Sequence, residues 1–229
     1  MAVVIFDIET VGQDFEILDE ISKEYFLKFA KTDEEIQLAK DSLSFFPLTA
    51  QIVTIGMIEA ETDNGFVYFQ NGGGKAEKFT ENNCVYISGS EREVLENFWA
   101  QIKKYNQFVT FNGRVFDCPF AMLRSAMNGI RPSKNLMPYR YAFTQHVDLH
   151  DQLSFYEALK RRFSLHMWCQ AFGIKSPKEE GISGLQVKDL YKEGRYHDIA
   201  RYCARDIQAT KEHYKYWEKY LKFQGEARY

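Results

Sequence analysis

The 229-residue sequence predicts an α/β fold: a mixed sheet, antiparallel in its first part and built from parallel crossover units in its second part, flanked by helices. Three observations lead to this prediction. Two early strand-like segments are joined by a short turn, which is how antiparallel neighbours connect. Later strand-like segments alternate with amphipathic helical segments, which is how parallel neighbours connect. A long amphipathic helix near the C-terminus then supplies a cover for the sheet.

The first predicted strand ends in two acidic residues. The apolar run VVIF at residues 3–6 is typical of a strand buried on both faces, and Asp7 and Glu9 follow it with Ile8 between them. Strand residues two apart point the same way, so both carboxylates project together from the strand end. At ~4 Å and an effective dielectric of ~20, two ionised carboxylates repel by about 4 kcal/mol. Either the strand stops here and the acids reach solvent, or a divalent cation lies between them.

The rest of the chain divides into helices and strands in a simple order. A helical insertion at about 13–46 precedes a hairpin whose turn carries the sequence TDNG, and Ser90 with Glu93 forms a capping box at the start of a helix. We expect one domain over residues 1–229, with the insertion between the first and second strands. The predicted segments are helices at 14–30 and 32–46, strands at 51–61 and 65–70, a helix at 90–105, a strand at 107–112, a helix at 118–129, a strand at 143–149, helices at 150–159 and 164–173, a loop at 174–186, and a last helix from near His197 toward Phe223.

Composition excludes several classes of protein. A hydrophobic content of 45% is normal for a globular chain and excludes wholesale disorder. No apolar run approaches the ~20 residues of a membrane span, so we expect no membrane partner. The four cysteines lie far apart without a C-x-x-C pair, which favours free thiols in a reducing compartment and a cytoplasmic location. The net charge of −3 means that any nucleic-acid partner is held by local basic groups and metal ions.

Two further segments place acidic residues near the predicted sheet edge or on a helix face. Asn112 ends a strand, and Asp117 opens the next helix, either as an ordinary N-cap or as a carboxylate at the ligand-binding edge of the sheet. Tyr202 and Asp206 lie four residues apart, hence on one face of the last helix. Taken alone, that pair could be a simple hydrogen bond beside the core.

Together, these segments resemble a known set of motifs. D-x-E at Asp7, N-x-x-x-F-D at Asn112 and Y-x-x-x-D at Tyr202 occur in the order of the three motifs of the DEDDy class of 3′–5′ exonucleases. The sequence is particularly similar to the proofreading domain of family-B DNA polymerases and to its stand-alone bacterial relatives, over nearly the whole chain. Segments such as PLTAQIVTIGMIE and RYCARDIQATKEHYKYW share this resemblance. It implies an RNase H-like fold.

The resemblance also implies roles for single residues. Two divalent cations, Mg²⁺ or Mn²⁺, would relieve the repulsion between the acids, lower the pKa of a bound water and stabilise the leaving oxygen. Tyr202 would orient the attacking water, since a phenol with a pKa near ~10 is a poor base at neutral pH. The implied metal ligands are Asp7, Glu9, Asp117 and Asp206, and the implied substrate-binding residues are Thr10, through its backbone amide, Asn112 and Phe116.

The function implied is hydrolysis of DNA from single-stranded or frayed 3′ ends, with release of nucleoside 5′-monophosphates. Two alternatives stay open: a 3′–5′ exoribonuclease with the same active site, and an inactive nucleic-acid-binding scaffold. A separate polymerase or repair complex as partner is not readable from the sequence. His213 is an alternative to Tyr202 as the base, although its spacing from Asp206 is too long. Asp148 and Asp151 suit structural hydrogen bonds or capping. Lys175 and Lys178 either contact substrate phosphates or belong to a solvated loop.

Overall fold

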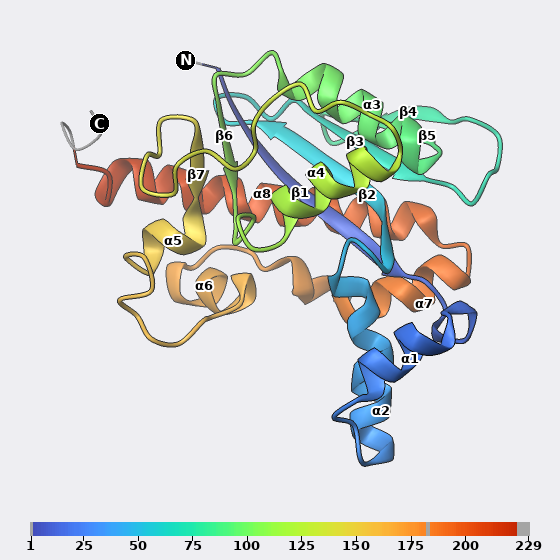
Figure 1. Cartoon of the computed structure of the whole chain (residues 1–229). Coiled ribbons are helices and arrows are strands. Elements are labelled where there is room, and N and C mark those ends of the chain that lie inside the picture. Colours follow the sequence, from blue (N-terminus) through green and yellow to red (C-terminus); the bar gives the residue numbers. More distant parts are fainter. Residues whose placement is uncertain (1, 182–183, 224–229) are drawn as a thin grey trace.

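The computed structural model of the chain describes residues 2–181 and 184–223 and is built around one seven-stranded sheet (Figure 1). The sheet order is β4-β5-β3-β2-β1-β6-β7. β2 pairs antiparallel with β1 and β3, whereas β6 pairs parallel with β1 and β7, which confirms the predicted mixed sheet. β3 and β5 are also parallel, so the first part is not purely antiparallel. The strands are β1 (Val3–Gly12), β2 (Ala50–Glu59), β3 (Gly65–Gln70), β4 (Lys78–Glu81), β5 (Cys84–Gly89), β6 (Gln107–Thr110) and β7 (His146–Asp148).

Helices cover both faces of the sheet, and the alternation of β1 assigns each of its side chains to one of them. Val4 and Phe6 pack into the core on the side of α3 and α4, and Val3 and Ile5 pack on the side of α8. The two helical layers are visible in Figure 1. The helices, with 3-10 helices marked η, are η1 (Phe15–Ile17), α1 (Glu20–Leu27), α2 (Asp33–Asp41), η2 (Ser42–Phe45), α3 (Glu91–Ile102), α4 (Asp117–Met127), α5 (Leu149–Leu153), α6 (Leu165–Phe172), η3 (Pro177–Glu180), η4 (Gly184–Gln186), α7 (Val187–Lys192) and α8 (Tyr196–Tyr220).

The prediction that β1 ends at its acids is wrong. β1 continues to Gly12 because β2 pairs with it along its whole length, with Asp7 opposite Gly56 and a register shift after Glu9. By contrast, β6 pairs with β1 only along Val3–Ile5. Beyond that point, no strand of the described residues pairs with this edge of β1, and the acids lie along this edge, inside the strand.

Other element predictions are confirmed or corrected. The hairpin, the helix at 90–105 and the last helix are confirmed by β2, β3, α3 and α8. The hairpin of β4 and β5 was not predicted, although Asn82 and Asn83 at its turn have the positive φ angles, 48° and 62°, that asparagine tolerates.

The predicted helix at 150–159 is mostly wrong, because α5 ends at Leu153 and three left-handed residues follow. The predicted loop at 174–186 contains η3 and η4, with residues 182–183 outside the described residues, and α7 after it was missed.

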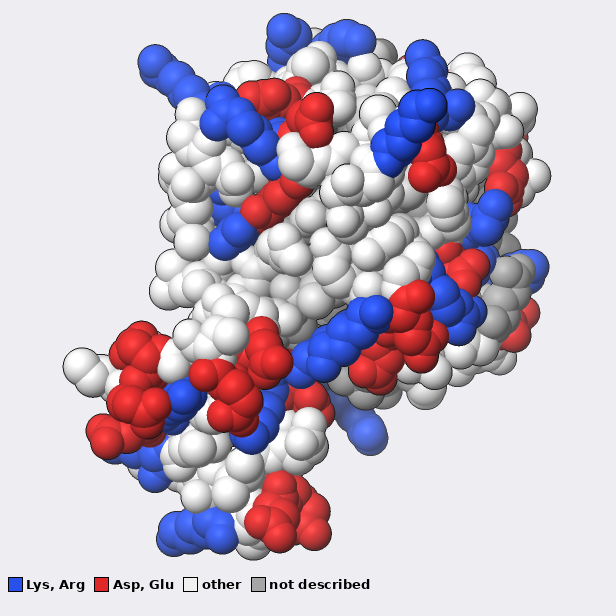
Figure 2. All heavy atoms as spheres, turned by 90° about the vertical axis from the view of Figure 1, so that its right-hand side faces the viewer, with Lys and Arg blue, Asp and Glu red and all other residues white. Residues whose placement is uncertain are grey.

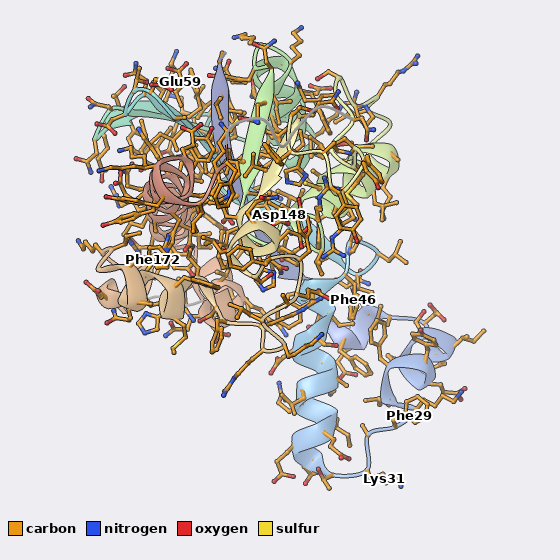
Figure 3. All side chains as sticks on the ribbon, turned by 90° about the vertical axis from the view of Figure 1, so that its left-hand side faces the viewer. Phe29, Lys31, Phe46, Glu59, Asp148 and Phe172 are labelled. Atoms are coloured by element: carbon orange, nitrogen blue, oxygen red, sulfur yellow. The ribbon has the colours of Figure 1, made fainter. Side chains whose placement is uncertain are left out.

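The helices between β1 and β2 form an arm, residues 15–45, that projects from the body of the molecule (Figures 1 and 3). Figure 3 shows Phe29 and Lys31 toward its far end and Phe46 at its base. The single predicted helix at 14–30 is broken into η1 and α1, since Asp19 is extended and caps α1 with its side chain. Neither α1 nor α2 contains a described residue that is buried. One domain with an insertion stays a prediction.

The four cysteines are free and buried, as expected from their spacing. Within the described part of the chain, no helix is long and apolar enough to cross a membrane.

Candidate active site

A cavity of about 410 Å³ lies along the open edge of β1 and collects residues from all three sequence motifs. Its walls come from β1, the loop after β6, the start of α4, α5, the segment before α6 with the start of that helix, and α8. Seven of the eight predicted site residues line it: Asp7, Glu9, Asn112, Phe116, Asp117, Tyr202 and Asp206. Segments about 100 residues apart in the sequence therefore meet at one place.

The carboxylates of β1 face α8 because they follow the same alternation as Val3 and Ile5. Ligand atoms of Asp7, Glu9 and Cys203 all lie within 4.8 Å of one another. Burial raises the pKa of Asp7 well above its usual range, and the negative charges of Asp117, Asp206 and Glu9 raise it further. The pKa of Glu9 is raised by the same two causes, burial first. Without a cation, this cluster therefore resists ionisation.

Asp117 is tied directly to β1. Its Oδ1 accepts a hydrogen bond of 3.0 Å from the backbone N–H of Ile8, which the absence of a neighbouring strand leaves available. Burial raises the pKa of Asp117 to about 7, while backbone hydrogen bonds, that of Ile8 included, oppose the rise. The N-cap interpretation of Asp117 is wrong: it is the first residue of α4, and the cap position is taken by Phe116, which makes no side-chain cap hydrogen bond.

Asp148 shapes the loop that carries Asn112. Asn112 has a left-handed backbone with φ of 61°, and its N–H donates to Asp148 Oδ1 at 2.9 Å. The N–H of Arg114 donates to Asp148 Oδ2 at 2.9 Å, and that of His150 donates to Oδ1. Asp148 thus binds three backbone groups, as its predicted structural role requires. Asp151 is likewise structural, since it binds the guanidinium of Arg140 through both carboxylate oxygens.

Tyr202 and Asp206 lie one turn apart on α8 and both face the cavity. Burial raises the pKa of Asp206 to about 7, whereas a hydrogen bond from Tyr202 and the positive charges of Arg205 and Lys178 lower it in part. The pKa of Tyr202 is raised by burial and then by the charges of Asp206, Glu9 and Asp7. Its hydroxyl therefore stays protonated at neutral pH and acts as a hydrogen-bond donor or an orienting group.

Thr10 is the one predicted site residue that is not described at the wall of the cavity. Its hydroxyl donates a 2.7 Å hydrogen bond to the carbonyl oxygen of Ser44, and so links β1 to η2 at the base of the arm. The register shift between Glu9 and Thr10 redirects the strand at this point. A role for the Thr10 backbone amide stays a prediction.

His213 does not line the cavity. It is fully buried, its Nδ1 lies 2.8 Å from the carbonyl oxygen of Ala209, and burial lowers its pKa. The positive charge of Lys178 lowers the pKa of Asp206, whereas Lys175 lines a different cavity beside α8.

Sequence reasoning missed several residues at the site. Cys203 of α8 directs its thiol at the backbone oxygen of Asp7 at 3.6 Å, and burial raises the pKa of that thiol well above its usual range. Arg162, Phe163 and Ser164 line the cavity from the segment before α6. The available signal was the run KRR at residues 160–162, which is the only basic triplet in the sequence.

The donor set fits a hard divalent cation. Four carboxylates converge, and each has a pKa raised by burial or by its acidic neighbours. Oxygen-only ligands are those that Mg²⁺ and Mn²⁺ prefer, and a cation turns mutual repulsion into attraction. The chemistry of these four groups is therefore consistent with a metal site.

Comparisons with known proteins agree with this geometry. Residues 44–228 match the model of a family described as a predicted 3′–5′ exonuclease related to the exonuclease domain of PolB. The matched range includes Asp117, Tyr202 and Asp206 and begins after Asp7 and Glu9. No curated protein matches the chain.

A solved structure extends the comparison to almost the whole chain. The family B DNA polymerase from the hyperthermophilic archaeon Pyrobaculum calidifontis is similar with a TM-score of 0.60 and 17% identity. The similarity covers 96% of this chain but only 24% of that polymerase, so the chain spans about a quarter of its length. At this identity the similarity concerns the fold, and it confirms the predicted RNase H-like sheet flanked by helices.

Proposed function

The chain belongs to the family of predicted 3′–5′ exonucleases related to the exonuclease domain of PolB, and on this basis we propose that it is a metal-dependent 3′–5′ exonuclease acting on DNA. It hydrolyses the terminal phosphodiester bond of single-stranded or frayed 3′ ends and releases nucleoside 5′-monophosphates. The observation that carries the proposal is the convergence of Asp7, Glu9, Asp117, Asp206 and Tyr202, from three separate segments, at one cavity.

The four carboxylates would hold two divalent cations, Mg²⁺ or Mn²⁺. When bound, these ions supply an activated water and stabilise the charge that develops at the phosphate and the leaving oxygen. Asp117 is well suited to hold its position during turnover, because Ile8 N–H fixes one of its oxygens. Three elements thus contribute ligands, and each is anchored in the core rather than in a surface loop.

Tyr202 is assigned to orienting the attacking water. Its raised pKa keeps the hydroxyl proton in place, so it holds a water by hydrogen bonding rather than by removing a proton. Tyr202 is 5% exposed and belongs to a buried apolar cluster with Val11 and Val53, and this packing restricts its ring. A fixed hydroxyl reduces the freedom of the nucleophile before attack.

Asn112 and Phe116 are assigned to binding the terminal nucleotide. The Phe116 ring lies 5.2 Å from the ring of Phe120, centroid to centroid, and is partly buried against the core while lining the cavity. A fixed aromatic face suits stacking against any base, so we expect little sequence preference. Lys178, whose charge acts at Asp206, is a further candidate for contact with a substrate phosphate.

The test is digestion of single-stranded DNA, frayed duplex DNA and RNA that carry a label at the 5′ end. With Mg²⁺ or Mn²⁺, the DNA ladder shortens from the 3′ end and mononucleotides are released, while a circular single strand stays intact. Asp206→Asn serves as the inactive control. Full activity in excess chelator, or cuts inside the circle, contradicts the proposal.

The RNA substrate tests the alternative function, since attack by water does not use the 2′-hydroxyl and the same site could act on RNA. Preferential digestion of RNA would replace DNA as the substrate. An inactive nucleic-acid-binding scaffold is disfavoured because all four acids are present. A separate polymerase or repair complex as partner, and a cytoplasmic location, stay predictions.

A further inference from the structure

One arginine stands out in a cavity that is otherwise lined by acids. Among the described residues of its wall, Arg162 is the only arginine or lysine, whereas four carboxylates line the same space. Cations at the carboxylates would neutralise the phosphate that is cut. The next phosphate along a strand in this cavity still needs a positive group, because otherwise the acids repel it.

Arg162 belongs to a short, strongly basic segment. Lys160, Arg161 and Arg162 are consecutive and exposed, in a chain whose net charge is −3. Phe163 separates them from Ser164, the N-cap of α6, so the run lies close to the start of that helix. Of the three, Arg162 alone is among the residues described at the cavity wall, and a local positive charge of this kind is how a protein without overall positive charge binds a phosphate backbone.

A strained turn precedes this segment. Phe155, Tyr156 and Glu157 have φ angles of 52°, 54° and 69°, so three consecutive residues other than glycine are left-handed. Hydrogen bonds hold the turn: Tyr156 N–H donates to the Asp151 carbonyl at 2.7 Å, and Gln152 donates to the Tyr156 hydroxyl at 2.8 Å. Such strain persists only where the surroundings enforce it, and it concentrates at functional sites.

The turn presents Glu157 to two arginines. Arg162 contacts the Glu157 carboxylate at 2.5 Å, and Arg140 lies 3.8 Å from the same oxygen. Arg140 is itself held by Asp151 at 2.6 Å. The Arg162–Glu157 pair is about half exposed and therefore weak. Arg162 can leave it for a phosphate while Glu157 keeps Arg140 as its partner.

Exposed aromatic rings lie around this ion pair. Tyr139 and Tyr141 flank Arg140 in the sequence and are 70% and 55% exposed, with their centroids 5.6 Å apart. Tyr141 lies 4.9 Å from Tyr156 of the strained turn. Aromatic faces beside basic groups are the combination that binds single strands without reading their sequence.

We propose that Arg162 is a positioning residue that binds a backbone phosphate of the substrate strand other than the one that is cut, exchanging Glu157 for that phosphate when the strand binds. This inference rests on the proposed exonuclease function and names the part of the strand that the site holds. The ligand is single-stranded nucleic acid long enough to carry at least one phosphate beyond the scissile one.

The experiment compares Arg162→Gln with Arg161→Gln. The two variants lose the same charge at adjacent positions, but the Arg161 guanidinium lies 5.7 Å over the Phe163 ring and is not among the residues described at the cavity. Two probes are used: a ten-nucleotide single strand of DNA, and the p-nitrophenyl ester of thymidine 5′-monophosphate, which carries only the phosphate that is cut. Binding of the DNA is measured with Ca²⁺ in place of Mg²⁺, and kcat/KM is measured for both probes with Mn²⁺.

We expect Arg162→Gln to weaken DNA binding by about tenfold or more, the effect of one charged hydrogen bond, and to lower the slope of log Kd against log salt by about 0.7. Arg161→Gln should stay within about threefold of wild type, and both variants should cleave the ester at nearly the wild-type rate. Equal losses of binding in the two variants overturn the inference, since only general electrostatics would then act. So does a loss of ester cleavage in Arg162→Gln, which would place the arginine at the scissile phosphate. A wild-type protein that cleaves neither probe refutes the exonuclease function, and the binding comparison still tests Arg162.

Discussion

Replacing Asp206 by asparagine should stabilise the metal-free protein while removing its activity. In the folded state the pKa of Asp206 is raised from 3.8 to about 7, chiefly by burial. A rise of about three pKa units corresponds to about 4 kcal/mol in favour of the protonated form. Asparagine is similar in shape to the protonated acid and never ionises, so it escapes this penalty. The charge of Asp206 also raises the pKa of Glu9, so its removal relieves a second carboxylate.

The sign of the pH dependence follows from proton binding. Between about pH 4 and pH 7 the folded protein binds more protons at Asp206 than the unfolded chain does, so its stability falls as the pH rises through this window. The free energy of unfolding of the variant should exceed that of wild type by less than about 2 kcal/mol at pH 5 and by about 4 kcal/mol at pH 8. For a chain of this size, about 4 kcal/mol corresponds to roughly 8–16 °C in Tm.

Thermal unfolding in excess chelator at about pH 5 and pH 8 measures the two gains. Added Mn²⁺ at pH 8 should then raise the Tm of wild type by several degrees, because it binds the folded state, and should raise that of the variant much less. Asp148→Asn is the matched control: it makes the same chemical change at another buried aspartate whose carboxylate binds backbone N–H groups. An Asp206 variant that melts at or below the wild-type temperature at pH 8 in chelator refutes the argument that burial of the ionised Asp206 carboxylate destabilises the fold.

Three further predictions concern single residues. Tyr202→Phe keeps the ring and loses the hydroxyl, so single-turnover rates at saturating Mn²⁺ should fall by about 10²-fold, near 2.7 kcal/mol, with the Mn²⁺-induced rise in Tm retained; a variant within twofold of wild type removes Tyr202 from the mechanism. Asp148→Asn loses the acceptor of Arg114 N–H, so the free energy of unfolding at about pH 5 should fall by about 1–3 kcal/mol, as measured by chemical denaturation, and unchanged stability would disprove the structural role of Asp148. Asp7→Ala should abolish activity while circular dichroism shows an intact fold, and residual activity above a few per cent would contradict its assignment as a metal ligand.

The parts of the site that the sequence predicts depend on short, regular spacings. Asp7 and Glu9 share a face because strand residues alternate, and Tyr202 and Asp206 share a face because helix residues recur after about four positions. Neither argument requires knowing which distant segment of the chain lies beside the pair. Local spacing does not predict that the two pairs meet. They meet because the face of β1 that carries Val3 and Ile5 packs against α8, and the pairing of the strands decides which face that is.

The failures occur where distant parts of the chain determine local structure. Gln51 lies opposite Val11, so pairing with β2 extends β1 beyond its acids, and no pattern within residues 3–12 carries that information. The turn at residues 155–157 contains no glycine, and its left-handed backbone is held by hydrogen bonds from its N–H groups to the Asp151 carbonyl and the Ser154 hydroxyl. Neither secondary-structure propensity nor hydrophobic periodicity therefore predicts that Arg162 lines the cavity.

The distribution of charge explains how a chain with a net charge of −3 could act on a polyanion. The arm, residues 15–45, contains eight acidic and four basic residues and carries −4, and the rest of the chain, with 25 basic and 24 acidic residues, carries +1. Figure 2 shows the acidic side chains crowded on the projecting arm. At physiological salt, charges act over only about 8 Å, so a phosphate responds to its immediate neighbours rather than to the net charge. Under the proposed function, the arm would repel a strand that lies along it, whereas Arg162 would attract one at the cavity, and cations at the carboxylates would complete the binding of its 3′ end.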